Sequence, residues 1–295
     1  MSTPITAALV KDLRERTGAG MIDCKKALEA TGGDLDKAAE KLRMDGMAKA
    51  DKKGSRVAAE GVIALAESAD AIALVEVNSE TDFVSKGDEF QGLAQAAARV
   101  ALAQRPADLA ALLAARDGNE TLEEKRRALV AKLGENMTIR RFEVVSKAGG
   151  ALAHYLHGTK IGVVVALEAG DAELARDIAM HVAASSPRYL DAASVPAEVL
   201  AAERKIVEAQ TAEQSAGKPA EIIAKMIDGK LRKFVGEITL LGQPFVKNPD
   251  ESVEKLLKGR NARVARFVRF AVGEGIEKQV ADFAAEVAAQ AGLKA

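Results

Sequence analysis

The sequence predicts an α+β protein that is mostly helical and contains two small sheets. Two observations predict this class. Apolar residues recur at helical spacing in several segments, and short Val- and Ile-rich runs bounded by turn residues lie between those segments. The chain has 295 residues, enough for two domains, and 48% hydrophobic with 29% charged residues is typical of a folded protein rather than a disordered one.

The composition also argues against several functional classes. The 42 Lys and Arg residues balance 43 Asp and Glu residues, so we expect no direct nucleic-acid binding. The single cysteine, Cys24, excludes a disulfide framework, and three histidines leave little material for a metal site. No apolar run approaches the roughly 20 residues of a membrane helix, and the N-terminus lacks a targeting pattern. We therefore expect a cytoplasmic protein with no metal, no cofactor and no membrane contact.

Residues 1–45 predict three short helices. Thr3 and Pro4 are suited to the start of the first helix, because proline loses nothing at an early helical position. The glycines of residues 18–20 break the pattern, and a second helix is expected over 23–30. Asp34 is a candidate N-cap for the third helix.

The next segment, 46–56, is polar and basic and is interpreted as a linker. The chain then predicts two strands, three helices and a further strand. Asn119 is the expected cap of the third of these helices, whose inward residues are Leu122, Leu129, Val130 and Leu133. The expected ranges are 61–66 and 72–77 for the strands, 88–103, 106–116 and 119–133 for the helices, and 136–145 for the last strand.

The second half predicts strands at 151–156 and 161–167 and a helix at 172–184, the same order as in the first half. Two explanations of this similarity are equally good: an internal duplication, or the likeness that Val/Ala-rich strands and helices have in any case. Two helices at 198–216 and 220–234 form a hairpin. This hairpin either projects or lies on its own core. Strands at 237–241 and 263–272, flanking a helix at 252–257, and a last helix at 279–291 complete the prediction.

Little in the sequence indicates catalysis. There is no nucleophile elbow, no P-loop and no metalloprotease motif. His154 and His157 lie three apart on a predicted strand and so point to opposite faces. His181 lies among apolar helix residues and is expected to be a packed core histidine.

The most informative segment is Asn78 to Lys86, with the sequence NSETDFVSK. It follows a strand and precedes a helix, so we expect it at the surface, where Thr81 or Asp82 can cap backbone N–H groups. Phe83 is notable because the chain has only 8 Phe, 2 Tyr and no Trp. Phe83 either folds inward against the following helix or is presented as an apolar anchor for a partner's pocket.

Two long motifs resemble a known family. The run 76–86 resembles the central motif of bacterial translation elongation factor Ts, and the run 13–28 is similar to the other motif of that family. The resemblance extends over essentially the whole chain in order. Further similar positions are Glu135-Asn136, Arg140-Arg141, His157-Gly158, Ile161-Gly162, the turn 242–245 and the run 272–275.

The resemblance implies a specific domain organisation. The chain is expected to begin with a three-helix N-domain, similar to a ubiquitin-associated domain, followed by a linker. Two related core subdomains follow, the second interrupted by a coiled-coil dimerisation hairpin, and a C-terminal module ends the chain. The ranges, in that order, are 1–55 for the N-domain, 56–140 for the core N-subdomain, 141–186 with 233–276 for the core C-subdomain, 187–232 for the hairpin and 277–295 for the C-terminal module.

The same resemblance implies a function without catalysis: guanine-nucleotide exchange on elongation factor Tu, a GTPase. The expected sites are a wedge at the GTPase's Mg and phosphate site and contacts from three other regions. The wedge residues are Thr81, Asp82, Phe83 and Val84, and the other contacts are Arg14, Gly18, Gly20 and Met21 in the N-domain, His157 and Gly158 in the C-subdomain, and Phe283 in the C-terminal module. A homodimer or 2:2 heterotetramer through the hairpin is also implied. The alternative is an RNA-binding accessory protein of translation, which only the basic segment 49–56 supports.

Overall fold

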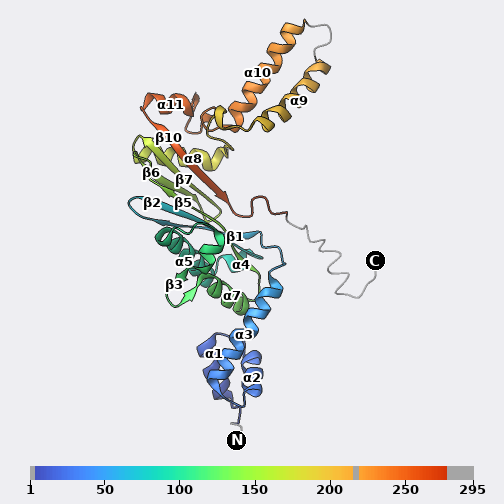
Figure 1. Ribbon diagram of the computed structural model, residues 1–295, viewed down its shortest axis with the longest axis vertical. Helices are drawn as coiled ribbons and strands as arrows, with labels where there is room; N and C mark the ends of the chain where they lie inside the picture. Colours follow the sequence, from blue (N-terminus) through green and yellow to red (C-terminus); the bar gives the residue numbers. More distant parts are fainter. Residues whose placement is uncertain (1–3, 215–218, 278–295) are drawn as a thin grey trace. The chain divides into compact units, whose positions relative to one another are not determined.

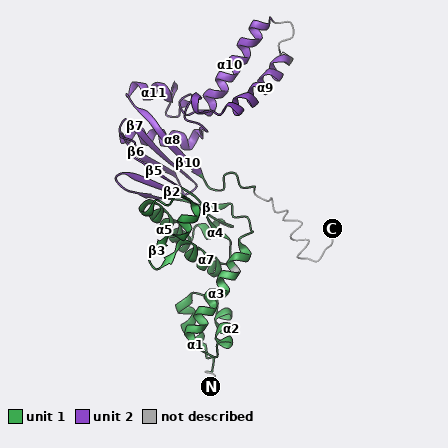
Figure 2. Ribbon diagram, in the orientation of Figure 1, with its two compact units in different colours: residues 1–64, 75–142, 271–295 green, residues 65–74, 143–270 purple. Residues whose placement is uncertain are grey.

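The computed structural model describes residues 4–214 and 219–277. It contains 51% helix and 24% strand, which confirms the α+β class. The chain divides into two compact units (Figure 2). Unit 1 comprises the described parts of residues 1–64, 75–142 and 271–295, and unit 2 comprises residues 65–74 and 143–270.

Three helices form a small bundle at the N-terminal end of unit 1 (Figure 1): α1 (Ala7–Thr17), α2 (Met21–Ala30) and α3 (Leu35–Lys53). Its core is thin and contains Leu13, Cys24, Leu28 and Ala38. Asp34 caps α3 as predicted. The predicted start of α1 at Thr3-Pro4 is wrong, because Thr6 is the residue whose side chain accepts the N–H of Leu9.

The predicted linker at 46–56 is also wrong, because α3 continues to Lys53. The added helical turns pack against α7 (Leu122–Leu133). A Cβ at Gly46 would lie 3.0 Å from the Cβ of Ala131, so the small residue permits close approach of the helices. Ala50 is buried, and Lys53 Nζ donates to the carbonyl of Gly134 at 2.5 Å. Packing thus extends a helix through a segment whose polarity predicted a loop.

A three-stranded sheet follows in the order β1-β2-β5, formed by β1 (Glu60–Glu67), β2 (Ala71–Ser79) and β5 (Met137–Ser146). All nine residues of the central strand β2 are buried. The segment between β2 and β5 contains α4 (Asp82–Ser85), α5 (Asp88–Gln104), α6 (Leu109–Ala114) and α7. The range of α5 agrees with the sequence-based expectation, and that of α7 agrees except around its start. Helix α4 was not predicted. The helix expected over 106–116 is shorter, because Asp108 caps α6 by accepting the N–H of Ala111 and Arg116 lies in a strand.

Before α7, the structure contains a short hairpin that the sequence did not predict, between β3 (Arg116–Asp117) and β4 (Glu120–Thr121). Consequently Thr121, rather than Asn119, caps α7, and it forms a reciprocal capping box with Glu124. Leu133 was expected to face inward but is 36% exposed, because it is the last helical residue before the Gly134 turn.

Unit 2 contains a sheet in the order β10-β7-β6, with β6 (Leu152–His157), β7 (Ile161–Ala169) and β10 (Arg263–Ala271). Strands β6 and β7 are antiparallel, with Leu152 opposite Ala166 and His157 opposite Ile161. Helix α8 (Ala172–Ser185) packs on this pair. The order strand, strand, helix therefore occurs in both halves of the chain, while an internal duplication stays a prediction.

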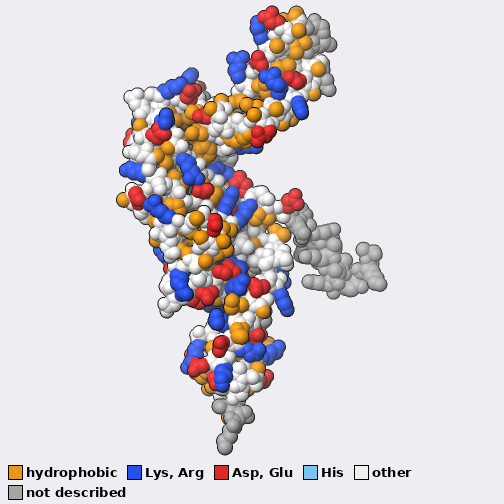
Figure 3. All heavy atoms as spheres, viewed as in Figure 1, with side chains coloured by type: hydrophobic (Ala, Val, Ile, Leu, Met, Phe, Trp, Pro, Cys, Tyr) orange, Lys and Arg blue, Asp and Glu red, His pale blue; other side chains and the backbone are white. Residues whose placement is uncertain are grey.

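Helices α9 (Ala197–Gln214) and α10 (Ala220–Ile238) form the predicted hairpin. They lie side by side and extend away from the β6–β7–β10 sheet (Figure 1), so the hairpin projects from its own unit. No described side chain of α10 is buried, and Ile222 is 48% exposed. Apolar and charged side chains are interspersed on the visible surface of the hairpin (Figure 3).

The last part of unit 2 differs from the prediction. The expected strand at 237–241 is wrong, because α10 continues to Ile238 and only a single bridge joins Thr239 to Tyr189. A small hairpin follows, formed by β8 (Pro244–Phe245) and β9 (Asn248–Ser252), and leads into α11 (Val253–Gly259). The short helix η1 (Ala192–Ser194) precedes α9. The predicted helix at 279–291 lies outside the described residues.

Candidate functional site

The candidate site begins with an ion network at the end of β2. Glu76 is fully buried, and its carboxylate binds Arg140 at 3.0 Å and Arg141 at 2.5 Å, both on β5. It also accepts the backbone N–H of Gly273 at 2.7 Å and the side-chain amide of Asn78 at 3.1 Å. These contacts hold the end of β2 in place, and the loop that follows begins there.

Burial of Glu76 opposes its ionisation, but three hydrogen-bond donors outweigh that effect. The backbone N–H of Gly273, the amide of Asn78 and the guanidinium of Arg141 together hold the pKa of Glu76 below its ordinary value of 4.5. The carboxylate is thus charged at neutral pH, and its network is complete only in that state.

The loop after β2, residues 80–86, is fastened to the segment after α7. Glu135 accepts the backbone N–H of Thr81 at 3.1 Å and the Thr81 hydroxyl at 2.9 Å. In return, Glu80 accepts the backbone N–H of Asn136 at 2.6 Å. The Thr81 hydroxyl also caps α4 by accepting the N–H of Val84 at 3.4 Å.

The fastened loop presents Phe83 to solvent. The Phe83 side chain is 83% exposed, the highest fraction among the exposed large apolar residues in the described part of the chain. This geometry removes the alternative in which Phe83 folds inward. Thr81, Asp82 and Val84 around it are half-buried, and Asp82 forms an ion pair with Lys86 at 2.6 Å. The four expected wedge residues therefore form one contiguous surface.

The expected N-domain residues lie around the turn between α1 and α2. Arg14, Gly18, Gly20 and Met21 are all exposed. Gly18 has a φ of 66° and ends α1 by donating its N–H to the carbonyl of Arg14, a conformation that favours glycine. Ile22 is 71% exposed beside Met21 and was not identified from the sequence.

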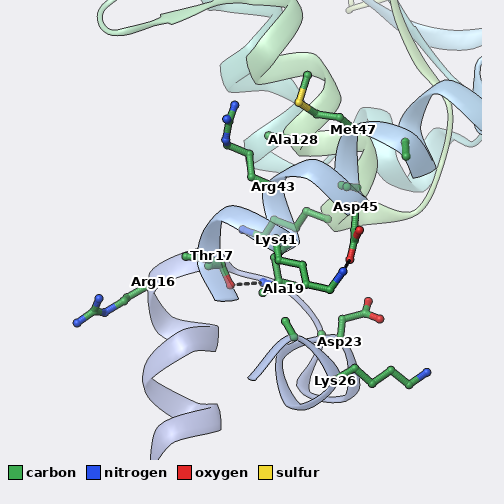
Figure 4. A pocket seen from close by; sticks show the side chains of 18 of the residues that line it. Arg16, Thr17, Ala19, Asp23, Lys26, Lys41, Arg43, Asp45, Met47 and Ala128 are labelled. Atoms are coloured by element: carbon green, nitrogen blue, oxygen red, sulfur yellow. Dashed lines mark hydrogen bonds and ion pairs between the residues drawn. The ribbon is translucent and has the colours of Figure 1, made fainter. Parts of the chain in front are cut away.

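The inner side of this turn borders a groove of about 790 Å³ (Figure 4). The walls come from the α1–α2 turn, α3 and α7. Lys41 and Asp45 of α3 form an ion pair at 3.2 Å at this groove. Six basic and four acidic residues contribute to the lining, so the groove has no strong charge preference.

In unit 2, His157 and Gly158 lie at the exposed turn between β6 and β7. Gly158 has a φ of 58°, so the turn uses the left-handed region that favours glycine. His157 Nδ1 lies 3.4 Å from the hydroxyl of Tyr155, which occupies the same face of β6. Phe283, the expected residue of the C-terminal module, lies outside the described residues.

His181 is a core residue, as predicted. It is fully buried, its Nδ1 accepts the N–H of Val246 at 3.2 Å, and its Nε2 lies 2.9 Å from Gln243 Oε1. Among residues 4–214 and 219–277, no group of three or more His, Cys, Asp and Glu side chains is arranged to hold a metal ion. Within the same ranges, no helix is both long and apolar enough to span a membrane.

Sequence reasoning missed the role of Glu135 and Asn136. Both were noted only as positions similar to the family, although their contacts fasten the loop to the segment between α7 and β5. The available signal was a pair of polar residues directly after the glycine that ends α7. That signal gave no partner, because the contacts join residues 54 and 56 positions apart in the chain.

Comparisons with known proteins agree with the resemblance. A family model described as Elongation factor TS matches residues 80–274. Elongation factor Ts of Thioalkalivibrio sulfidiphilus is 57% identical over 97% of this chain and 98% of its own length. Those of Methylococcus capsulatus and Xanthomonas oryzae are 56% and 54% identical, covering 97% and 98% of this chain and 98% and 99% of their own. The chain belongs to the elongation factor Ts family of translation elongation factors.

Proposed function

We propose that this protein is the guanine-nucleotide exchange factor of elongation factor Tu. It binds the GDP-bound GTPase, disturbs the Mg and phosphate site, and promotes release of GDP so that GTP can bind. Membership of the family supports the partner, and one structural observation supports the mechanism. That observation is the exposed Phe83 on a loop that is held at residues 80 and 81 by hydrogen bonds to Asn136 and Glu135.

The energetic basis of exchange is linkage between two ligands of one GTPase. A factor that binds the empty GTPase better than the loaded one weakens nucleotide binding by the same factor. Each 1.4 kcal/mol of this antagonism changes affinity about tenfold. No bond is made or broken in the step, so the function needs no catalytic residue and the protein is not an enzyme in the chemical sense.

The wedge residues have complementary roles in this proposal. Phe83 supplies an apolar area that gains free energy when a pocket of the GTPase covers it, about 1.5–3 kcal/mol for complete burial. Asp82 supplies a carboxylate that competes for groups around the Mg and phosphate site. Thr81 and Val84 flank the pair and shape its surface.

Other regions of the chain supply further contacts. We propose that Arg14, Gly18, Gly20 and Met21 bind the GTPase domain, that His157 and Gly158 bind a β-domain of the same partner, and that Phe283 adds a contact from the C-terminal module. We also propose the domain organisation that the resemblance implies. The N-domain is 1–55, the core N-subdomain 56–140, the core C-subdomain 141–186 with 233–276, the hairpin 187–232 and the C-terminal module 277–295. The projecting hairpin is proposed to form a homodimer or a 2:2 heterotetramer.

The test is release of fluorescent GDP from elongation factor Tu, measured by stopped flow at saturating factor. We expect Phe83→Ala to slow release at least about tenfold, because a central aromatic anchor contributes 2 kcal/mol or more. Val246→Ala removes a half-exposed apolar side chain that lies outside the proposed contacts and is the matched control. Release at the wild-type rate with the Phe83 variant would remove the proposed mechanism.

A further inference from the structure

The Thr81–Glu135 contact fixes the direction of a single hydroxyl proton. The Thr81 hydroxyl lies 2.9 Å and 3.0 Å from the two carboxylate oxygens of Glu135, which can only accept. Its proton therefore points to Glu135, and its lone pairs face the N–H of Val84 at 3.4 Å. The orientation in which the Thr81 hydroxyl donates to Glu135 is thus the same orientation in which its oxygen caps α4.

The contact is also reciprocal along the backbone. Glu135 accepts the N–H of Thr81, and Glu80 accepts the N–H of Asn136, so each segment supplies one carboxylate and one backbone donor to the other. Glu80 is further paired with Arg56 at 3.6 Å. Two adjacent residues on each side are therefore fixed in register.

Helix α4 has a second anchor at its C-terminal end, where the carbonyl of the buried Ser85 accepts the side-chain amide of Gln91 at 2.6 Å. It has four residues, far fewer than an isolated helix needs for stability in water. Phe83, the large apolar side chain of α4, is exposed and therefore adds little packing within the chain. The direction in which Phe83 points thus depends on the anchor at Ser85 after it and on the contacts of residues 80 and 81 before it.

We propose that Glu135 is a positioning residue for partner binding: it preorganises residues 80–86 so that Phe83 is already presented in the unbound factor. The proposal rests on the proposed function. Holding a loop in its bound conformation removes an ordering cost from association. If only a fraction of the molecules present Phe83 correctly, the apparent dissociation constant rises by the inverse of that fraction, while the bound complex is unchanged.

The experiment compares Glu135→Ala with a matched control in the full-length chain. Glu124 accepts the Thr121 N–H at 2.8 Å and the Thr121 hydroxyl at 3.1 Å, the same two donors, at the other end of α7. We expect Glu135→Ala to raise the factor concentration at half-maximal GDP release about tenfold and to leave the maximal rate within about twofold. Glu124→Ala is expected to lower the melting temperature of the factor by as much as Glu135→Ala does, but to leave the half-maximal concentration unchanged.

A double-mutant cycle assigns the effect to the contact itself. Thr81→Val removes the hydroxyl, so adding Glu135→Ala to it is expected to cause much less further loss than Glu135→Ala causes alone. Additive effects of the two substitutions would contradict the proposal. An unchanged half-maximal concentration in Glu135→Ala, or an equal shift in Glu124→Ala, would also overturn it.

Amide hydrogen exchange of the free factor tests the same proposal without the GTPase. We expect faster exchange in residues 80–86 in Glu135→Ala than in the wild type or in Glu124→Ala. Equal exchange in all three proteins would overturn the positioning role. If the wild-type factor failed to accelerate GDP release, the proposed function would be wrong, and hydrogen exchange would still decide whether Glu135 orders the loop.

Discussion

The exposure of Phe83 conflicts with the ordinary preference of an aromatic side chain. A large aromatic side chain favours burial, yet 83% of this one is exposed at the start of a four-residue helix. The backbone N–H groups of Thr81 and Val84 on either side of it are hydrogen-bonded, so the exposed side chain belongs to a held loop. An exposed apolar side chain on an ordered loop gains free energy only when another molecule covers it, which is the basis of the proposed wedge.

His181 provides a residue-level prediction about pH. Burial lowers the pKa of His181 below its ordinary value of 6.5, and the hydrogen bond with Gln243 opposes only part of that shift. Below pH 6.5 the unfolded chain therefore binds a proton that the folded chain does not. The contribution of His181 to stability is complete above pH 6.5 and is lost as the pH falls toward the folded-state pKa.

Chemical denaturation between pH 7.5 and 5.5 measures this effect. The free energy of unfolding is expected to fall over that interval in the wild type and to fall less in His181→Gln, which cannot gain a proton. Glu76 does not interfere, because its pKa lies below 4.5 and its network is lost only at lower pH. Parallel pH profiles for the two proteins would show that His181 does not titrate as described.

At the scale of elements, local sequence patterns predicted most helices and strands but not the ones that distant packing decides. Asp34 caps α3 and the residues of β2 form a buried strand, as their types indicated. In contrast, α3 extends over a polar segment because Gly46 meets α7 and Ala50 is buried. The β3–β4 and β8–β9 hairpins are too short to give a periodic signal.

The candidate site likewise contains one residue that the sequence pointed to, Phe83, and one whose contacts it could not predict, Glu135. The scarcity of aromatics and the loop position drew attention to Phe83, but the sequence could not decide whether Phe83 pointed inward. Glu135 acts through a partner 54 residues away, so no local pattern could assign its role. Contacts of this kind become visible only when the sheet order β1-β2-β5 brings the segments together.

The turn between α1 and α2 provides an element-level prediction. Met21 is 53% exposed beside the Gly18–Gly20 turn, and Met44 on α3 is 54% exposed. If the turn contacts the GTPase, Met21→Ala is expected to weaken binding about fivefold through lost apolar burial, whereas Met44→Ala is the matched control. Calorimetry measures both, and equal affinities for the two variants would remove the α1–α2 turn from the proposed interface.

At the scale of the whole molecule, the chain has two compact units, and residues of both are proposed to contact one partner. A factor that binds through several surfaces can retain its partner while one surface disturbs the nucleotide site. The energetic consequence is reciprocal: every decrease that the factor causes in nucleotide affinity is matched by the decrease that the nucleotide causes in factor affinity.

The most direct test of this account is calorimetric titration of the full-length protein into elongation factor Tu, once without nucleotide and once with saturating GDP and Mg²⁺. The account predicts that the nucleotide-free GTPase binds the factor at least about a hundredfold more tightly, equivalent to about 2.8 kcal/mol of antagonism. Equal affinities for the two forms would contradict the account, because a factor that does not distinguish them cannot promote nucleotide release by linkage.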